Sequence, residues 1–407
     1  MQFPNADKRM AADVTADDDL PLSGLRVLDL SQGIAGPYCG LVLRQQGAQV
    51  IKVEPPQGDW SRHMGRSLEG HSAIFTACNA GKQGVCIDAA TPGGRAQLHD
   101  LAMDVDVIVQ NFRPGAAERM GVGWDALVAR KPSLVYVSIT GWGRTGPMAH
   151  RPTLDTTMQA ASGMMHANSG ADGKPRRVGL YVIDYATGLY AAQAVMAALL
   201  RRARTGRGRH VEVAMLQAAA AFQNYLTIDA AMFPGQQSVA FNAPTGLFDT
   251  QDGRQIYVSM LNDAMFQRLA QALDMADWLD DTSLHVSRGR QLRAVELNQR
   301  LSTRMAQGTL AHWSALLERH DILFAPARSP GELPEDPQVK HLKVFSTCSV
   351  PGVGGVPLAG LPGTVGAAQV LEPAPRLGQH NAEWAVGHGL HGPSLGADSG
   401  KTLSKQA

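Results

Sequence analysis

The sequence is poor in cysteine, and this excludes two kinds of protein. Its 407 residues include four cysteines, too few for the disulfide framework that stabilises small secreted domains. No two of them form a CxxC pair or another spacing typical of metal ligands; they are Cys39, Cys78, Cys86 and Cys348. We therefore expect reduced, buried thiols and no metal site.

The sequence also lacks net charge and long apolar segments. Lysine and arginine total 37 against 36 aspartate and glutamate residues, so no overall field attracts nucleic acid or an anionic membrane. Residues 1–20 contain an acidic triplet and no apolar stretch of signal-peptide length. The longest apolar run, around residues 191–200, is too short to span a bilayer. These absences predict a cytoplasmic protein that binds neither nucleic acid nor membrane.

Strand and helix patterns alternate through the first half of the chain. Short branched-apolar segments predict β-strands at Arg26–Leu30, Gln49–Val53, Val105–Gln110 and Leu134–Ile139. Helical patterns precede or connect them at Tyr38–Gln46 and Gly93–Ala102. Strands separated by helices favour a parallel sheet covered on both faces. The prediction is an α/β fold with a doubly wound parallel sheet.

The second half predicts a further, smaller domain. A long helical pattern at Ala186–Arg204 is followed by a glycine- and proline-rich segment at 234–246. Asp252-Gly253 is a strong turn signal within the hairpin-like segment Leu247–Val258, and helical patterns then fill Ala264–Leu317. A chain of this length has room for two or three domains, so we predict a second α/β domain of about one hundred residues.

The glycines after the first strand argue against a nicotinamide cofactor. Gly33, Gly36 and Gly40 are spaced GxxGxxxG rather than GxGxxG. Pro37 removes an amide where the helix should open with free N–H groups. What remains is a sharp turn at the carboxyl end of a strand, in a sheet whose crevice should bind a ligand.

Three segments bring polar and aromatic side chains to that same edge of the sheet. Asn111-Phe112-Arg113-Pro114-Gly115 supplies an amide, an aromatic ring and a guanidinium, and Arg119 lies four residues further on. Arginine pairs with phosphate and stacks on planar rings. The set therefore suits a nucleotide with phosphates, although a turn with solvated arginines fits equally well. The other two segments are Gly58-Asp59-Trp60-Ser61-Arg62 and Gly141–Pro147.

Carboxylates are the other chemical resource, because the chain has no GxSxG elbow. Asp155 and Asp184 each lie just before a helical pattern. Either could be a catalytic group, or only a first-turn acid that stabilises its helix by about 1 kcal/mol. His63, His150 and His166 are possible bases, but lone histidines in loops are usually surface residues.

A series of short motifs in a fixed order covers most of the chain. They are Pro21–Leu30, Ala35-Gly36-Pro37, Gly47–Glu54, Asn111–Gly115, Ser138–Pro147, Gln159–Gly163, Asp184–Ala191, Thr205–Gly208 and Leu377–His380. No single motif is specific. Together, from about Leu22 to Trp384, they resemble the class III CoA-transferases, the group of formyl-CoA transferase and carnitine CoA-transferase that also includes the α-methylacyl-CoA racemases.

The resemblance implies a domain layout and an assembly. A mobile tail at 1–21 would precede a large CoA-binding domain at 22–205. A linker at 206–235 would lead to a small domain at 236–325, and residues 326–407 would form a linker and return to the large domain. The family also implies a homodimer in which two chains pass through each other as interlocked rings.

The resemblance further implies the reaction and its residues. Coenzyme A moves from an acyl-CoA donor to a free carboxylic acid, with no cofactor beyond the CoA of the substrate. Carried over position by position, the nucleophile is Asp184 and the CoA contacts are Ala35, Arg62, Asn111, Phe112, Arg113 and Arg119. A helix N-terminus at Asp184 would favour its ionised form. Pro55 and Ala90 replace an arginine and a lysine found in relatives, which leaves the adenine and 3′-phosphate contacts open.

Two other functions remain open at this point. A racemase would need a histidine beside Asp155, where the chain has Leu154, and a leucine cannot carry a proton. His150 or His166 could supply that base if the loop folds back. A CoA- or nucleotide-binding protein without catalysis would be favoured if Asp184 had been lost, but the chain retains Asp184.

The substrate acids are open too. Residues 234–246 lack the glycine-rich loop of formyl-CoA transferases, so oxalate is not favoured as the acceptor. Succinyl-CoA or another short-chain acyl-CoA as the donor follows from its frequency in the family alone.

Overall fold

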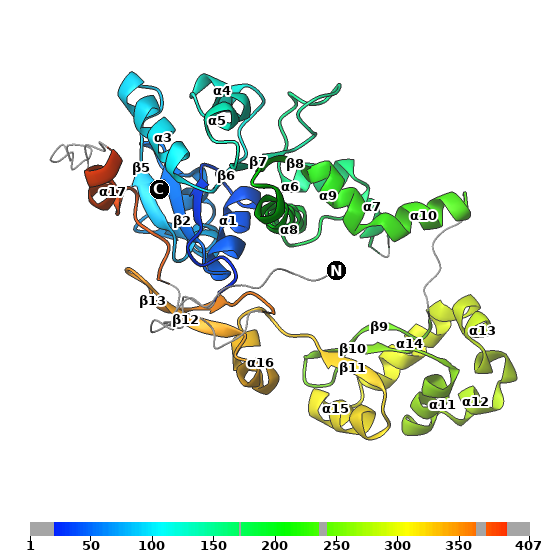
Figure 1. Cartoon of the computed structure of the whole chain (residues 1–407). Helices are drawn as coiled ribbons and strands as arrows, with labels where there is room; N and C mark the ends of the chain where they lie inside the picture. The colour runs from blue at the N-terminus through cyan, green and yellow to red at the C-terminus, as the bar shows by residue number, and fades with distance from the viewer. Residues whose placement is uncertain (1–19, 171, 236–241, 364–371, 389–407) are drawn as a thin grey trace, which may run out of the picture. The chain divides into compact units, whose positions relative to one another are not determined.

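The computed structural model describes residues 20–170, 172–235, 242–363 and 372–388 (Figure 1). The chain forms two compact units. The larger comprises Met1–Asn224 and Leu342–Ala407, and the smaller comprises Tyr225–His341. Each unit has its own sheet and its own hydrophobic core.

The larger unit is built on a six-stranded sheet in the order β5-β2-β1-β6-β7-β8. Every neighbouring pair in it is parallel. From β1 the chain adds β2 and β5 on one side, then crosses back and adds β6, β7 and β8 on the other. The predicted parallel sheet is confirmed. Its strands are β1 (Arg26–Asp29), β2 (Gln49–Glu54), β5 (Gln83–Cys86), β6 (Val107–Gln110), β7 (Val135–Thr140) and β8 (Arg209–Ala214).

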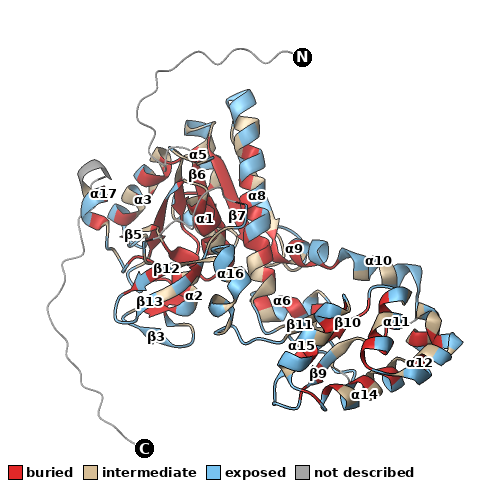
Figure 2. Ribbon diagram, turned by 90° about the horizontal axis from the view of Figure 1, so that it is seen from below, coloured by how far each residue is buried: buried red, intermediate tan, exposed pale blue. Residues whose placement is uncertain are grey.

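Helices cover the sheet on both faces, so its strands bury side chains in both directions. Val27 and Leu28 are neighbours in β1 but belong to different hydrophobic clusters, because successive side chains of a strand point to opposite faces. Figure 2 shows the central strands β6 and β7 largely buried, whereas β8 at the sheet edge is partly exposed. The covering helices are α1 (Ala35–Gln45) and α8 (Val182–Thr205) at the first cluster, and α3 (Pro92–Asp104) and α5 (Trp124–Arg130) at the second.

A glycine allows α1 and α8 to pack closely. A Cβ atom on Gly188 would lie 2.7 Å from the carbonyl oxygen of Ala35 and 3.1 Å from the ring of Tyr38, so a larger residue would force the helices apart. Asp184 lies one turn before Gly188, and this contact therefore fixes the start of α8 beside the start of α1. Among the described residues, α8 is also the one helix long and apolar enough to span a membrane, although part of it lies in the core against the sheet.

Residues from the far end of the chain complete the larger unit. His380 and Asn381, at the start of α17 (Asn381–His388), accept hydrogen bonds from the backbone of β5: Nδ1 of His380 from Gly84 N at 2.9 Å, and Oδ1 of Asn381 from Cys86 N at 2.8 Å. A hairpin of β12 (Phe345–Val350) and β13 (Gly354–Ala359) packs against Leu41 of α1. The larger unit therefore contains residues from both ends of the chain.

The smaller unit is a three-stranded antiparallel sheet packed against helices. Its strand order is β11-β10-β9, and Gly253, with φ of +70°, lies in the predicted turn between β9 and β10. The strands are β9 (Gly246–Asp249), β10 (Gln255–Ser259) and β11 (Leu323–Pro326). The helices include α11 (Asp263–Ala272), α12 (Ala276–Asp280), α13 (Ser287–Leu292), α14 (Ala294–Met305) and α15 (Leu310–Arg319).

Several predicted boundaries differ from the structure. Residues 206–224 are not a linker, because Val211 pairs with Val137 in the sheet as part of β8 and α9 (Met215–Phe222) packs on α8. The smaller unit runs from Tyr225 to His341 rather than from 236 to 325, and it includes α16 (Pro337–His341). Helix α1 begins at Ala35, earlier than predicted, because a proline in the first turn lacks only an N–H that has no partner within the helix. The predicted tail at 1–21 lies almost entirely outside the described residues.

Candidate active site

The winding of the sheet reverses between β1 and β6, and open α/β sheets bind ligands in the crevice at such a point. Gln32 follows β1 and Asn111 follows β6. The backbone N–H of Gln32 donates to Oδ1 of Asn111 at 2.9 Å, and Nδ2 of Asn111 donates to the Gln32 carbonyl at 2.7 Å. These two hydrogen bonds tie the two loops together across the reversal point.

A cavity of about 470 Å³, the switch-point cavity, opens here. Its walls come from the loops after β1, β6 and β7 and from the first turn of α8. The structure brings five of the predicted site residues to it: Ala35, Asn111, Phe112, Arg113 and Asp184. The other lining residues are Gln32, Ile34, Trp60, Pro114, Ile139, Thr140, Gly141, Ala149, His150, Arg151, Pro152, Thr153, Leu154 and Met215.

The two acids that sequence patterns could not distinguish have different roles. Asp155 is buried and caps the N-terminus of α8, because Oδ2 accepts from the backbone N–H groups of Ile183 at 2.8 Å and of Asp184 at 3.0 Å. Its other oxygen accepts from Nε2 of Gln159 at 2.6 Å. Asp155 starts α6 (Asp155–Ala161) in sequence but stabilises a different helix. The Asp184 side chain is therefore not needed as a cap, and it lines the cavity.

The environment of Asp184 raises the pKa of its carboxyl to about 7, through burial first and the nearby negative charge of Asp155 second. This reverses the sequence-based expectation that the helix N-terminus would favour the ionised form. Asp155 accepts the amide hydrogens that would otherwise stabilise a charge on Asp184. The Asp184 carboxyl thus changes its charge close to neutral pH.

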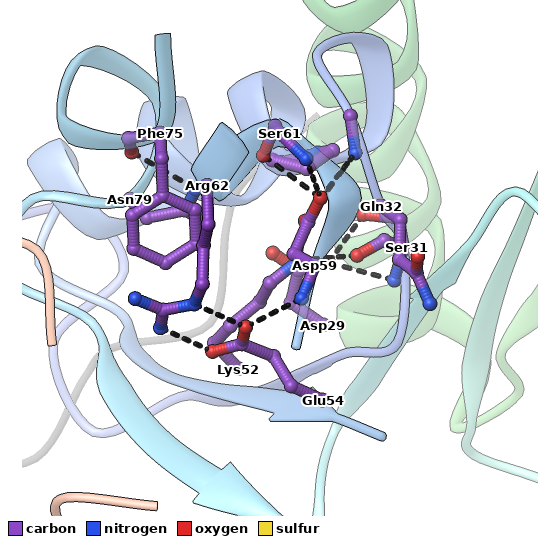
Figure 3. Close-up of polar contacts among 12 residues, drawn as sticks. Asp29, Ser31, Gln32, Lys52, Glu54, Asp59, Ser61, Arg62, Phe75 and Asn79 are labelled. Atoms are coloured by element: carbon purple, nitrogen blue, oxygen red, sulfur yellow. Dashed lines mark hydrogen bonds and ion pairs between the residues drawn. The ribbon is translucent and has the colours of Figure 1, made fainter. Parts of the chain in front are cut away.

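Arg62, a predicted CoA contact, is not among the cavity residues. It is buried, and its guanidinium forms two 2.7 Å hydrogen bonds with the carboxylate of Glu54 (Figure 3). The same group lies 3.7 Å from the centroid of the Phe75 ring and donates to the Pro375 carbonyl at 2.9 Å. Glu54 ends a buried strand and requires a cation, which explains why this arginine faces inward.

Arg119 does not reach the cavity either. It ends the short helix α4 (Ala116–Arg119) and is exposed. Arg113, by contrast, is both exposed and part of the cavity wall. Of the three arginines predicted to contact CoA, the structure therefore brings one to the switch-point cavity.

Two groups of lining residues were not assigned from the sequence. Trp60 belongs to the segment identified as an exit from the sheet, yet the residue chosen there was Arg62; Trp60 is 46% exposed and faces the cavity. The loop 149–154 contributes His150 and Arg151 beside Leu154. Sequence patterns gave His150 a role only if this loop folded back. In the structure the loop does border the cavity that Asp184 lines.

A second cavity of about 430 Å³ adjoins the first and shares Gln32 and Phe112 with it. Pro55 and Ala90, which stand where the resemblance implies an arginine and a lysine, both line this second cavity. Phe112 therefore borders both cavities, and the second is lined mainly by apolar side chains together with the acids Glu54 and Asp88. Within the described part of the chain, no group of three histidine, cysteine, aspartate or glutamate side chains is arranged to hold a metal ion.

The fold and the site define a doubly wound α/β protein with a cavity, lined by one carboxylate, where its strand order reverses, which is where open α/β sheets bind their ligands.

More specifically, the chain belongs to CoA-transferase family III, whose model matches residues 22–381. It is 33% identical to the succinyl-CoA:glutarate CoA-transferase of Mus musculus over 373 residues, which cover 89% of this chain and 85% of the relative. It is 32% identical to a probable fatty acyl-CoA transferase of Mycobacterium tuberculosis, over 90% of this chain and 98% of the relative. A crystal structure of a CAIB/BAIF family protein from Brucella suis matches with a TM-score of 0.81 at 30% identity, covering 90% of this chain and 99% of that one. The protein is an enzyme, a class III CoA-transferase, and the family predicted from the sequence is confirmed.

Proposed function

We propose that this CoA-transferase works through a covalent thioester between CoA and the carboxyl of Asp184. The observation that carries the proposal is the position of Asp184. Among the described residues that line the switch-point cavity it is the only acid. Asp155, the other candidate acid, instead caps the N-terminus of α8.

The reaction then proceeds by exchange of carboxylates. The Asp184 carboxylate attacks the thioester carbonyl of the donor and expels the CoA thiolate, which leaves a mixed anhydride. The thiolate attacks the Asp184 carbonyl of this anhydride, which gives the aspartyl-CoA thioester and releases the donor acid. The acceptor carboxylate attacks that thioester, and the expelled thiolate then attacks the acceptor carbonyl. This regenerates Asp184, and no cofactor beyond the substrate CoA takes part.

The raised pKa of Asp184 suits a nucleophile. A buried carboxylate is less solvated and more basic than an exposed one, so its ionised form attacks more readily. Ile34 and Ala35 also line the cavity at the start of α1, where the positive end of the helix dipole favours the oxyanions that develop.

The predicted CoA contacts divide into two groups. Asn111, Phe112 and Arg113 suit the binding of CoA, since Phe112 offers a ring between the two cavities and Arg113 an exposed guanidinium for phosphate. Arg62 would act indirectly, by supporting the cavity wall through Glu54. Arg119 would require a phosphate outside the cavity.

The substrates we propose are a short-chain acyl-CoA donor, such as succinyl-CoA, and a free carboxylic acid acceptor. One support is that the mouse relative is named for two dicarboxylic acids. Another is that Arg151 lines the cavity that contains Asp184, where a guanidinium can pair with a second carboxylate.

We also propose an interlocked homodimer. Its support is the apolar surface of α8 and α9 in the larger unit, where large apolar side chains are 37% or more exposed. They are Leu189, Tyr190, Met196, Leu200 and Phe222. Dilution should not separate interlocked chains unless a unit unfolds, so sedimentation that reveals a folded monomer would contradict this part of the proposal.

The covalent intermediate provides the decisive experiment. Succinyl-CoA is incubated with the enzyme without an acceptor, the thioester is trapped with hydroxylamine or borohydride, and the modified peptide is identified by mass spectrometry. The modification should lie on Asp184. A label on Asp155, or none under conditions of turnover, would reject the mechanism.

A further inference from the structure

The wall of the switch-point cavity rests on a group of buried charges that carboxylate exchange does not use (Figure 3). Three acids and three cations form this group: Asp29 in β1, Lys52 and Glu54 in β2, Asp59 and Arg62 in the segment after β2, and Lys82 just before β5. Each is at most 5% exposed, and they form the ion pairs Lys52–Asp59 (2.8 Å), Lys82–Asp29 (2.8 Å) and Arg62–Glu54 (2.7 Å). Replacing a buried ion pair with apolar residues often leaves a protein equally stable or more so. Stability alone therefore does not account for the group.

Asp59 connects two parts of the cavity wall. Its Oδ1 accepts hydrogen bonds from Gly33 N at 3.0 Å, from Ser61 N at 2.9 Å and from Ser61 Oγ at 2.8 Å. Its Oδ2 accepts from Nζ of Lys52 at 2.8 Å. Gly33 belongs to the turn after β1, whose residues Gln32 and Ile34 line the cavity. Ser61 belongs to the short 3₁₀ helix Trp60–His63, which contributes Trp60 to the same wall.

Lys52 holds Asp59 in its charged form. Burial alone would raise the pKa of Asp59, but the charge of Lys52 and the hydrogen bonds from Lys52, Ser61 and Gly33 outweigh it and lower that pKa. Nζ of Lys52 also donates to the carbonyl of Ser31, one residue before Gln32. Lys52 and Asp59 therefore both bond to the backbone of the turn after β1, the lysine to a carbonyl and the aspartate to an amide.

The turn after β1 packs directly against Trp60. Gly33 has φ of +84°, a conformation that favours glycine, and a Cβ atom there would lie 2.4 Å from Cζ2 of Trp60. The indole, 46% exposed, thus packs against this turn and also lines the cavity. Any movement of the turn must move this part of the wall.

We propose that Asp59, held by Lys52, is a positioning residue for CoA: it fixes the Gly33 turn against Trp60, so that the cavity wall is already formed when acyl-CoA binds. This inference rests on the proposed function, in which the switch-point cavity holds the CoA thioester. A wall that is ordered in advance reduces the entropy lost on binding. Loss of this order should weaken CoA binding more than it slows carboxylate exchange.

The first test compares Asp59→Asn with the same change at Asp106. Asp106 also accepts from a backbone amide, Arg26 N at 3.0 Å, and from a guanidinium, Nη1 of Arg202 at 3.0 Å. It immediately precedes β6, at the amino-terminal edge of the sheet, opposite to the cavity. We expect Asp59→Asn to raise the Kd of CoA in calorimetry and the KM of acyl-CoA by about tenfold or more, with kcat within about threefold. Asp106→Asn should leave both constants within about twofold of wild type.

A second pair of variants leaves every charge in place, so the proposal stays testable if Asp59→Asn does not fold. Gly33→Ala places a methyl group against Trp60, whereas Gly24→Ala, at a φ of +80°, meets no atom within 4 Å. Both substitutions impose similar backbone strain. Only Gly33→Ala should weaken CoA binding.

The outcomes separate this inference from the proposed function. If wild type transfers CoA while Asp59→Asn and Gly33→Ala bind CoA with unchanged Kd, the positioning role is wrong, even if both variants melt at lower temperature. A defect confined to kcat overturns it as well. If wild type binds CoA but forms no aspartyl thioester, the proposed mechanism fails, and the Kd comparison still decides whether Asp59 positions the wall.

Discussion

The two units of the chain differ in how many charged side chains they bury. In the larger unit, three ion pairs are buried beside the first two strands of the sheet, and two of their members, Asp59 and Lys52, bond to the turn that lines the switch-point cavity. In the described part of the smaller unit the only charged residue buried as a whole is Arg290, which bonds to the carbonyls of Ala243 and Leu284 and to the half-exposed Asp263. The smaller unit shows that this chain can build a core with almost no buried charge. The charges of the larger unit are therefore better explained by the site they support than by folding.

The acids of the two units also differ in the direction in which their pKa values are shifted. Asp277 and Asp281 in the smaller unit have lowered pKa values. Asp277 accepts a hydrogen bond from Arg300, and Asp281 accepts hydrogen bonds from Ser283, which has the larger effect, and from Arg293. Asp184 has a raised pKa, because desolvation first and the nearby charge of Asp155 second disfavour its ionised form. An acid with a cationic partner stabilises a surface, whereas an acid held without one is available for chemistry.

The largest expected effect distinguishes these two kinds of acid. Asp184→Ala should lower CoA transfer by about 10⁴-fold or more, since it deletes the covalent nucleophile, while Asp277→Ala should stay within about twofold of wild type because its carboxylate only pairs with an exposed arginine. Formation of new acyl-CoA, followed by mass spectrometry, measures both. Circular dichroism and gel filtration establish that each variant is folded. Transfer by Asp184→Ala within tenfold of wild type would contradict the assignment.

The next effect compares one buried cation from each unit. Lys52→Met should lower the free energy of unfolding by about 3–5 kcal/mol, because it leaves the fully buried Asp59 without its partner. Arg290→Met should cost less, about 1–3 kcal/mol, because Asp263 is 49% exposed and water can solvate it.

Urea unfolding of the two variants checks this comparison. The smaller unit has to be followed by its own signal, for which the buried Trp278 and Trp313 are suitable. Equal losses in both units would show that the buried charges of the larger unit have no special cost.

A smaller effect concerns pH. Because the ionised carboxylate is the attacking form and the pKa of Asp184 is about 7, the transfer rate should fall about tenfold per pH unit well below that value. The effect on stability has the opposite sign. The folded pKa lies above the unfolded value of 3.8, so this group favours folding at low pH and loses that contribution as pH rises towards 7.

Asp184→Asn is the matched variant for the stability effect. It should melt at a higher temperature than wild type at pH 8 and show a smaller difference at pH 5. A rate that is flat between pH 5 and 8, with substrate binding unchanged, would indicate that Asp184 is fully ionised in that range.

The last prediction is that the enzyme does not exchange the α-proton of an acyl-CoA. A 2-methylacyl-CoA incubated with the enzyme in deuterated water should gain no α-deuterium above the spontaneous background, while acyl exchange with free acids proceeds. Racemisation needs a second proton-transfer group, and Leu154 cannot be one. His150 lines the same cavity, so His150→Gln is the variant to compare. Deuterium incorporation at a rate close to CoA transfer, lost in His150→Gln, would make the isomerase the better description.

The sequence by itself determined the parallel sheet, the existence of a second smaller domain, and the family. Strand periodicity and the order of the motifs are properties of the sequence itself, so they can be recognised without knowing which elements pack together. The same is true of the cluster Asn111-Phe112-Arg113, because residues that directly follow a central strand must lie at the carboxyl edge of the sheet.

Only the tertiary structure decided which side chains face the site. Asp155 and Asp184 look alike in sequence, and the packing of α6 beside the start of α8 is what makes one a cap and leaves the other at the cavity. Arg62 faces inward because Glu54 lies across from it, so its neighbour Trp60 forms the wall. The pKa of Asp184 rises because burial and a second carboxylate meet there. Asp155 lies 29 residues before Asp184, and Glu54 lies eight residues before Arg62. In both cases the folded backbone decides whether the two side chains meet, and no local pattern contains that information.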